Sequence, residues 1–116
     1  MKRLLLIVLP LLLIVGCSSP EPINYETTLV EREDYKGDEV FYTKDTNKPY
    51  SGPVFSLYED GKKKGEGSLK DGKFDELWID WYENGQKESE TTYNVGTQYG
   101  LWTYWFKNGQ KSSEGA

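Results

Sequence analysis

Few side chains in this sequence could carry out catalysis. Histidine, the commonest general base and metal ligand, is absent, and Cys17 is the single cysteine. The remaining acid–base candidates are the carboxylates of Asp75, Glu76 and Asp80, the group that glycosidases use in pairs. These three do not recur in the repeats described below, so we interpret them as solvated turn and strand residues. We therefore expect no enzyme, no catalytic residue and no metal site, zinc included.

Cys17 follows a segment that is typical of an export signal. Lys2 and Arg3 form a short basic start, and residues 4–15 are Leu, Ile or Val except for Pro10. A membrane-spanning helix needs about 20 apolar residues, so this run is too short to cross a bilayer comfortably. Its length and flanks instead predict a helical signal peptide over residues 1–16.

Ile14-Val15-Gly16-Cys17 resembles the lipobox of bacterial lipoproteins. That resemblance implies cleavage between Gly16 and Cys17 and attachment of diacylglycerol and further acyl chains, such as palmitate, to Cys17. Two or three acyl chains hold a protein on a membrane for long periods. The alternative is a plain secretory signal followed by an incidental buried cysteine. In a Gram-negative cell, Ser18 after the cysteine resembles the pattern that is sorted to the outer membrane.

The charge of the processed chain limits its partners. Loss of Lys2 and Arg3 with the signal would change the formal net charge from −5 to −7. An acidic protein is repelled by phosphate backbones and by anionic lipid surfaces, so we expect no nucleic-acid binding. We expect the membrane contact to be the lipid anchor, with no cofactor beyond the acyl chains on Cys17.

The mature chain divides into two parts. Residues 17–36 contain Pro20, Pro22 and several small polar residues without a clear periodicity, which predicts a lipidated cysteine and a flexible tether. Residues 37–116 are predicted to form the folded domain.

A repeat of 24 residues runs through this domain. Its full units are predicted at about 50–73, 74–97 and 98–116, and residues 37–49 are predicted to be a degenerate unit that caps the array. The positions in register are Val54, Trp78 and Trp102; Leu57, Trp81 and Trp105; Tyr58, Tyr82 and Phe106; and Gly61, Gly85 and Gly109.

Each repeat has the pattern of a β-hairpin. An aromatic and β-branched run precedes Asp60-Gly61, Asn84-Gly85 or Asn108-Gly109, and these pairs predict two-residue type I′ turns. Second turns at Asp71-Gly72 and Val95-Gly96 lead into the next repeat. The fold class is therefore predicted to be all-β, with an elongated antiparallel sheet of tandem hairpins.

The repeat also resembles a known family. The Tyr-x-x-Gly turns, the Gly-x-Trp spacing and the phrase Lys107-Asn108-Gly109-Gln110-Lys111 are similar to MORN repeats, and most similar to a bacterial variant of antitoxin-type repeat proteins. The resemblance implies an elongated sheet used for protein–protein or membrane-associated scaffolding, with no catalytic residue. Glu76 departs from the pattern, because Gly52 and Gly100 occupy its position in the other units.

Strand alternation places the aromatic side chains in two ladders, one on each face of the sheet. A single sheet of this size cannot fully bury both. The ladders either pack the repeats together or leave part of the wider one exposed as a recognition strip, since Trp and Tyr are favoured binding anchors. The candidate binding residues are Trp78, Tyr82, Trp102, Tyr104 and Phe106.

These observations favour an exported lipoprotein that is anchored to the cell membrane and binds or scaffolds another envelope protein without catalysis. One alternative is an envelope protein that binds glycan, with the aromatic residues stacking on sugars of the cell wall. Another alternative is an immunity or antitoxin-like inhibitor of a toxin that acts in the envelope.

Overall fold

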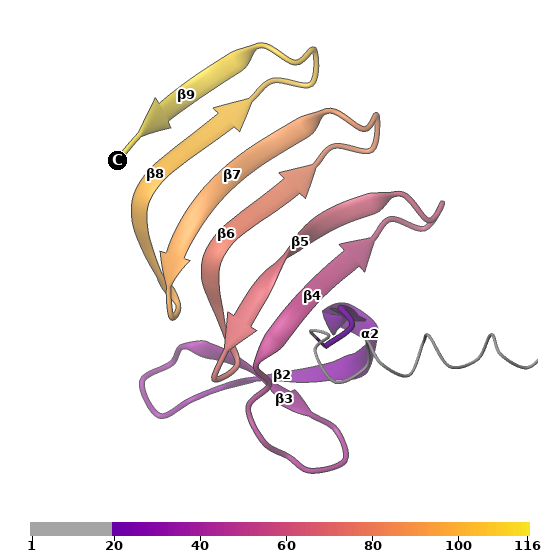
Figure 1. The fold of residues 1–116 in the computed structure, drawn as a ribbon, viewed down its shortest axis with the longest axis vertical. Helices are drawn as coiled ribbons and strands as arrows, with labels where there is room; N and C mark the ends of the chain where they lie inside the picture. Colours follow the sequence, from indigo (N-terminus) through magenta and orange to yellow (C-terminus); the bar gives the residue numbers. More distant parts are fainter. Residues whose placement is uncertain (1–19) are drawn as a thin grey trace, which may run out of the picture.

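The computed structural model describes residues 20–116, so the predicted signal peptide over 1–16 and its cleavage site at Gly16 and Cys17 lie outside the described residues. The described chain is built mainly of β-strands (Figure 1), which confirms the predicted all-β fold of tandem hairpins. Its elements are β1 (Ile23–Asn24), α2 (Tyr25–Thr28), β2 (Leu29–Glu33), β3 (Glu39–Thr43), β4 (Gly52–Leu57), β5 (Lys63–Lys70), β6 (Lys73–Trp81), β7 (Lys87–Asn94), β8 (Thr97–Trp105) and β9 (Lys111–Gly115).

Seven strands form one sheet in the order β1-β4-β5-β6-β7-β8-β9. From β4 to β9 each strand pairs antiparallel with the strand that follows it in the chain (Figure 1). The short strand β1 joins the other side of β4 in parallel, with Ile23 opposite Val54. Strands β2 and β3 form a separate two-stranded sheet. Within residues 20–116 the structure has no helix long and apolar enough to cross a bilayer.

Two kinds of turn alternate along the array. The β5–β6 and β7–β8 turns have two central residues, Asp71-Gly72 and Val95-Gly96, and all four have positive φ. This is the type I′ geometry that follows the right-handed twist of paired strands. Both second turns therefore lie where the sequence predicts them.

The turns at Asp60-Gly61, Asn84-Gly85 and Asn108-Gly109 differ from the predicted two-residue type I′ geometry. Trp81 pairs with Lys87, which leaves a longer loop, and within it only Gly85 has positive φ. The Asn84 Oδ1 accepts a hydrogen bond of 2.9 Å from the backbone N–H of Gln86. The same bond from the residue two positions ahead recurs at Asp60 and Asn108. This side-chain bond stabilises a type I turn followed by a left-handed glycine, so the type I′ prediction was wrong here.

The predicted tether over residues 17–36 is folded from Ile23 onward, which corrects that boundary. Asn24 caps the short helix α2 by accepting a hydrogen bond of 3.1 Å from the N–H of Glu26. Tyr25 packs edge-on against Trp78, and Leu29 is buried. Residues 23–33 show no periodic pattern of apolar residues, because the contacts are made by single residues on three short elements.

The predicted capping unit over residues 37–49 is also corrected. The N–H of Gly37 donates to the carbonyl of Asp34, as that of Gly61 does to Tyr58, so the same turn occurs 24 residues earlier. However, β3 pairs with β2 in the separate sheet and does not stack as a unit of the array. One link to the main sheet is the N–H of Phe41, which donates to the carbonyl of Gly72 at 2.9 Å.

The hydrophobic core lies between the first strands of the array and the segment α2–β2–β3. Its buried members are Leu29, Val54, Leu69 and Trp78. The Trp78 ring lies over Gly67, where an added Cβ would come within 2.2 Å of the ring. A residue without a side chain at this position therefore lets the indole lie flat on the sheet.

Candidate functional site

The main sheet has two faces with different surroundings. We call the face that bears Val54, Trp78 and Trp102 the core face, and the face that bears Ile79 and Trp81 the outer face. The segment α2–β2–β3 lies at the β4 end of the sheet, far from β8 and β9 (Figure 1). The core face is therefore covered at one end of the array and open at the other.

Trp78 lies in the covered part and is not available to a partner. Its side chain is only 5% exposed and packs on Phe74, with 4.4 Å between ring centroids. The indole Nε1 donates a hydrogen bond of 3.1 Å to the Asp80 Oδ1. The structure thus assigns Trp78 to packing.

Trp102 and Tyr104 lie together on the open part of the core face. Their ring centroids are 5.6 Å apart, and Tyr104 is 40% exposed. The Trp102 ring extends over Gly115 of β9, as Trp78 does over Gly67. Tyr93 of the neighbouring strand β7 is half-buried, and burial raises its pKa, with nearby Tyr104 acting in the same direction. Tyr93 itself packs on Phe74 of the core, with ring centroids 5.6 Å apart, so the partly exposed aromatic residues here are the Trp102–Tyr104 pair.

Tyr82 and Phe106 lie at the turns, apart from that pair. The Tyr82 hydroxyl donates a hydrogen bond of 2.6 Å to the carbonyl of Trp105, so this side chain joins two successive hairpins. Phe106 has no hydroxyl and is 55% exposed. The five predicted binding residues are therefore distributed over three places, and the structure brings together only Trp102 and Tyr104.

The carboxylates considered for acid–base chemistry have separate surroundings. Asp80 accepts hydrogen bonds from the Trp78 indole and from the Ser89 hydroxyl, each at 3.1 Å. Asp75 accepts a hydrogen bond of 2.9 Å from the N–H of Val95 in the adjacent turn. Among the described residues, no group of three His, Cys, Asp or Glu side chains could hold a metal ion.

The outer face carries a charge pattern that the sequence analysis did not identify. In each repeat a lysine that begins one strand forms an ion pair with a glutamate three residues later. Two of these lysines also lie over tryptophan rings: the Lys63 Nζ is 6.0 Å from the Trp81 centroid, and the Lys87 Nζ is 5.4 Å from the Trp105 centroid. The signal in the sequence was the spacing Lys-x-x-Glu after each turn, which recurs as Lys63–Glu66, Lys87–Glu90 and Lys111–Glu114.

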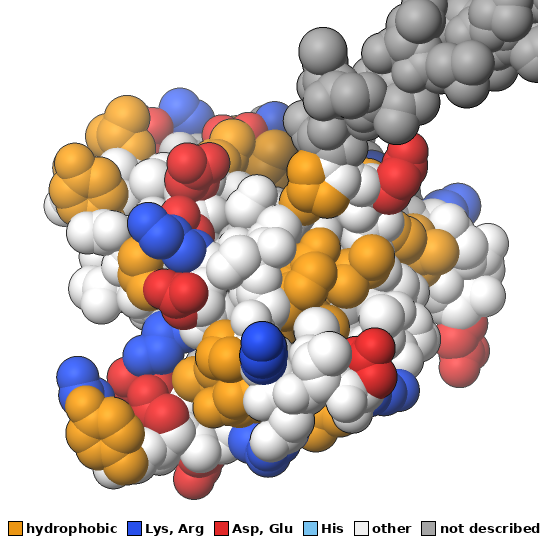
Figure 2. All heavy atoms as spheres, turned by 60° about the horizontal axis from the view of Figure 1, so that its bottom comes forward, with side chains coloured by type: hydrophobic (Ala, Val, Ile, Leu, Met, Phe, Trp, Pro, Cys, Tyr) orange, Lys and Arg blue, Asp and Glu red, His pale blue; other side chains and the backbone are white. Residues whose placement is uncertain are grey.

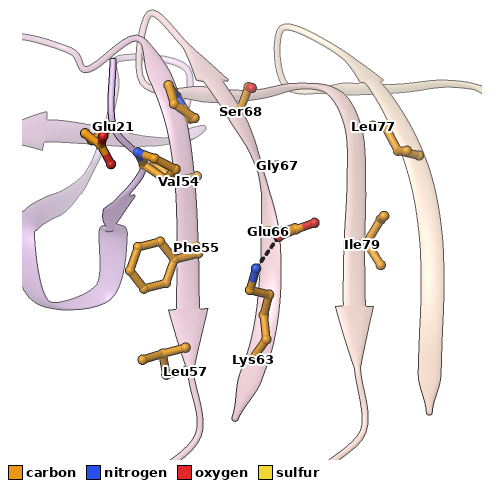
Figure 3. Close-up of a pocket in the computed structure, with 12 residues that line it drawn as sticks. Glu21, Val54, Phe55, Leu57, Lys63, Glu66, Gly67, Ser68, Leu77 and Ile79 are labelled. Atoms are coloured by element: carbon orange, nitrogen blue, oxygen red, sulfur yellow. Dashed lines mark hydrogen bonds and ion pairs between the residues drawn. The ribbon is translucent and has the colours of Figure 1, made fainter. Parts of the chain in front are cut away.

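A groove hollows the outer face above β5, between β4 and β6. Figure 3 shows Phe55 and Leu57 on one side of it, Ile79 on the other, and the Lys63–Glu66 ion pair between them. Its volume is about 570 Å³. A smaller hollow of about 180 Å³ lies beside Trp105 and Lys87. The outer face is thus a series of apolar strands separated by strands that carry paired charges.

Figure 2 views the molecule with its lower end brought forward. Hydrophobic side chains occur there in separate clusters, and acidic and basic side chains are mixed between them. Neither charge sign dominates this view. The end shown therefore presents no extended basic surface.

No protein-family model and no curated protein matches this sequence. A distant match among solved structures, described as "Crystal Structure of TarM", has 16% sequence identity and a TM-score of 0.36. The match covers 76% of this chain and 19% of that one, so this chain spans about a fifth of that protein's length. A likeness of this degree carries no argument about function.

Proposed function

We propose that this protein is an exported, lipid-anchored module that binds another envelope protein without catalysis. The anchor is assigned to Cys17 because a basic start, a short apolar run and a small residue precede this single cysteine. The partner is assigned to the open part of the core face.

The observation that carries the proposal is the Trp102–Tyr104 pair. Elsewhere on the same face α2–β2–β3 covers the aromatic side chains, whereas Tyr104 remains 40% exposed. Large aromatic side chains at the centre of a patch are the usual anchors of protein–protein interfaces. A partner that covers β8 and β9 would complete the burial that, within residues 20–116, α2–β2–β3 provides at the β4 end.

The link between anchor and domain is short. Five residues, Ser18 to Pro22, separate Cys17 from β1, so an extended chain from Cys17 to Ile23 spans at most about 22 Å. The strand β9 lies at the opposite edge of the sheet from β1. The domain is therefore held near the membrane by its β1–β4 edge, with the Trp102–Tyr104 pair towards the far edge.

Site-specific photo-crosslinking in intact cells tests the partner site. A photoreactive phenylalanine replaces Tyr104, and the matched control carries it at Tyr35, which is 92% exposed and lies in the β2–β3 turn. We expect one discrete adduct from position 104, lost on Trp102→Ala, and none from position 35. Equal adducts from both positions, or an adduct that persists in Trp102→Ala, would contradict the proposal.

The anchor is tested separately. We expect radiolabelled palmitate to enter the protein and to be lost in Cys17→Ser, which should also release the chain from the membrane fraction. In a Gram-negative host, fractionation should place the wild-type protein in the outer membrane. Labelling that survives Cys17→Ser would refute the anchor.

A further inference from the structure

The outer face repeats the same side chains at regular distances. The row nearest the longer turns is formed, in order across the sheet, by Leu57, Lys63, Trp81, Lys87, Trp105 and Lys111. Neighbouring strands lie about 4.8 Å apart, so equivalent positions of successive hairpins recur about every 9.6 Å. Trp81 and Trp105 therefore form two equivalent aromatic positions along a line that crosses the strands.

We propose that this row binds a β-1,4-linked glycan chain lying across the strands, with alternate sugar rings on Trp81 and Trp105. In an extended chain of this linkage successive rings are turned over, so the same ring face recurs once per disaccharide. That disaccharide repeat is close in length to the two-strand spacing of the sheet. Sugar rings have apolar faces that stack on indole, whereas their edges carry hydroxyl groups.

The charges of the row suit a neutral, hydroxyl-rich ligand. The Lys87 Nζ lies 2.5 Å from Glu90 and also near the Trp105 ring, so each repeat offers a donor and an acceptor with no net charge. Sugar hydroxyls use both kinds of partner at once. A strongly anionic polymer would be repelled by the glutamates of the row and by the chain as a whole, whose formal net charge is −5.

The surface leaves room for such a chain on both sides of Trp81. The groove of about 570 Å³ reaches Leu57 and Lys63 on one side, and the smaller hollow lies beside Trp105 on the other. The Lys63 and Lys87 side chains are half-exposed, at 49% and 40%. They can turn aside from the rings, because cation–π contacts at exposed sites are weak.

The twist of the sheet further restricts which form of glycan can bind. Adjacent strands are rotated by roughly 20–25°, so two strands turn Trp105 by about 45° relative to Trp81. A flat crystalline polysaccharide surface cannot follow this rotation. A single glycan chain can, so soluble chains and separate cell-wall strands are the expected form of the ligand.

This site goes beyond the proposed protein partner and lies on the opposite face of the sheet. Variants of Trp105 and variants of Trp102 and Tyr104 therefore separate the two activities. Leu57 also supplies a matched substitution, because it occupies in the first repeat the position that Trp105 occupies in the third. Trp105→Leu removes the aromatic ring and introduces a side chain that this position already holds elsewhere in the fold.

The test measures binding of β-1,4-linked N-acetylglucosamine oligomers to the full-length protein in detergent micelles by calorimetry. The dimer is too short to reach both Trp81 and Trp105. We therefore expect the hexamer to bind about tenfold more tightly than the dimer, which is the gain expected from one additional aromatic anchor. Trp105→Leu should bring the hexamer's affinity down to that of the dimer. Leu57→Trp should add a third ring and increase the hexamer's affinity several-fold. The double variant Trp102→Ala/Tyr104→Ala should bind as wild type.

Three results with the oligomers and the Trp105 variant would overturn the proposal. These are no measurable binding of the hexamer, equal affinities for dimer and hexamer, and hexamer binding that Trp105→Leu leaves unchanged. Loss of hexamer binding in a folded Trp102→Ala/Tyr104→Ala variant would also overturn it, because the glycan would then lie on the core face. If Trp105→Leu fails to fold, Leu57→Trp is the deciding variant: an increase in the hexamer's affinity supports the proposal, and no increase overturns it.

Discussion

The hydroxyl of Tyr82 donates a hydrogen bond of 2.6 Å to the backbone carbonyl of Trp105, 23 residues further along the chain. Tyr58 makes the same bond, of the same length, to the carbonyl of Trp81. One side chain per repeat therefore reaches across to the end of the next repeat's first strand. These bonds join successive hairpins near their longer turns, beyond the last ladder pairs.

Removal of one such hydroxyl should weaken the junction between two hairpins. We expect Tyr82→Phe to lower the free energy of unfolding by about 1 kcal/mol, the usual contribution of one hydrogen bond. The ring should remain in place, because the third repeat has Phe106 at this position. Urea denaturation measures the change, with Tyr35→Phe as the exposed control. A Tyr82→Phe protein as stable as wild type would show that the bond contributes nothing.

The contact of Trp78 with Gly67 makes the glycine position intolerant of a side chain. A Cβ there would lie 2.2 Å from the indole, so we expect Gly67→Ala to destabilise the protein by roughly 1–3 kcal/mol. Ser68→Ala is the control, because Ser68 lines the groove of the outer face and its change should stay within about 0.5 kcal/mol. Thermal unfolding followed by near-ultraviolet circular dichroism reports both stability and the packing of Trp78. Equal effects of the two substitutions would contradict the packing described here.

Glu76 has a left-handed backbone, with a φ of 65°, at the position that Gly100 occupies in the next repeat. Left-handed φ is unfavourable for a residue with a Cβ by roughly 1–2 kcal/mol, which exceeds the entropic cost of a glycine. We therefore expect Glu76→Gly to stabilise the protein by about 0.5–1 kcal/mol.

The matched test adds a side chain at the equivalent position of the next repeat. An added Cβ at Gly100 meets no other atom within 4 Å, so Gly100→Ala should destabilise by a similar amount through the backbone alone. Denaturant midpoints of both variants give the comparison. A destabilised Glu76→Gly protein would mean that the glutamate side chain makes a contribution larger than the strain.

The β2–β3 turn should respond to acid. The backbone N–H of Asp38 donates to Asp34 and, together with the N–H of Lys36 and the Lys73 ammonium group, lowers the pKa of Asp34 below its ordinary value. A lowered folded-state pKa stabilises the fold above the pKa of the unfolded chain, about 3.9 for aspartate. That stabilisation is lost as the pH falls from there through the lower, folded-state value.

Stability measured from pH 5 to pH 2 tests this assignment. Asp34→Asn should flatten the decline in unfolding free energy over this range. Lys73→Gln should flatten it only partly, because the backbone N–H of Asp38 is the largest cause of the lowered pKa. If Asp34→Asn leaves the slope as in wild type, the pH dependence of stability arises elsewhere.

The sequence predicts the array well because its signals are local. Turn glycines and alternating strands recur every 24 residues, and each strand pairs with its neighbour in the chain. The geometry of the longer turns was missed because Asn84-Gly85 is compatible with two turn types. The hydrogen bond that the Gln86 N–H donates to the Asn84 Oδ1 accompanies the longer turn.

The candidate site was harder to predict because burial is not local. Trp78 and Trp102 occupy the same position of successive repeats, yet only Trp78 packs against Tyr25. Tyr25 belongs to α2, which lies more than 50 residues earlier in the chain and lacks a periodic pattern. A single sequence therefore identified the aromatic ladder but not which of its members remain exposed.

The order of the strands has a consequence for how the chain acquires its structure. The buried members of the core all lie on elements up to β6, in the first part of the described chain, and each later hairpin adds to a strand that is already paired. Pairings between sequence neighbours close short loops and form quickly. A chain growing from its N-terminus can therefore fold its core before its last third exists, and each remaining hairpin then extends an existing template.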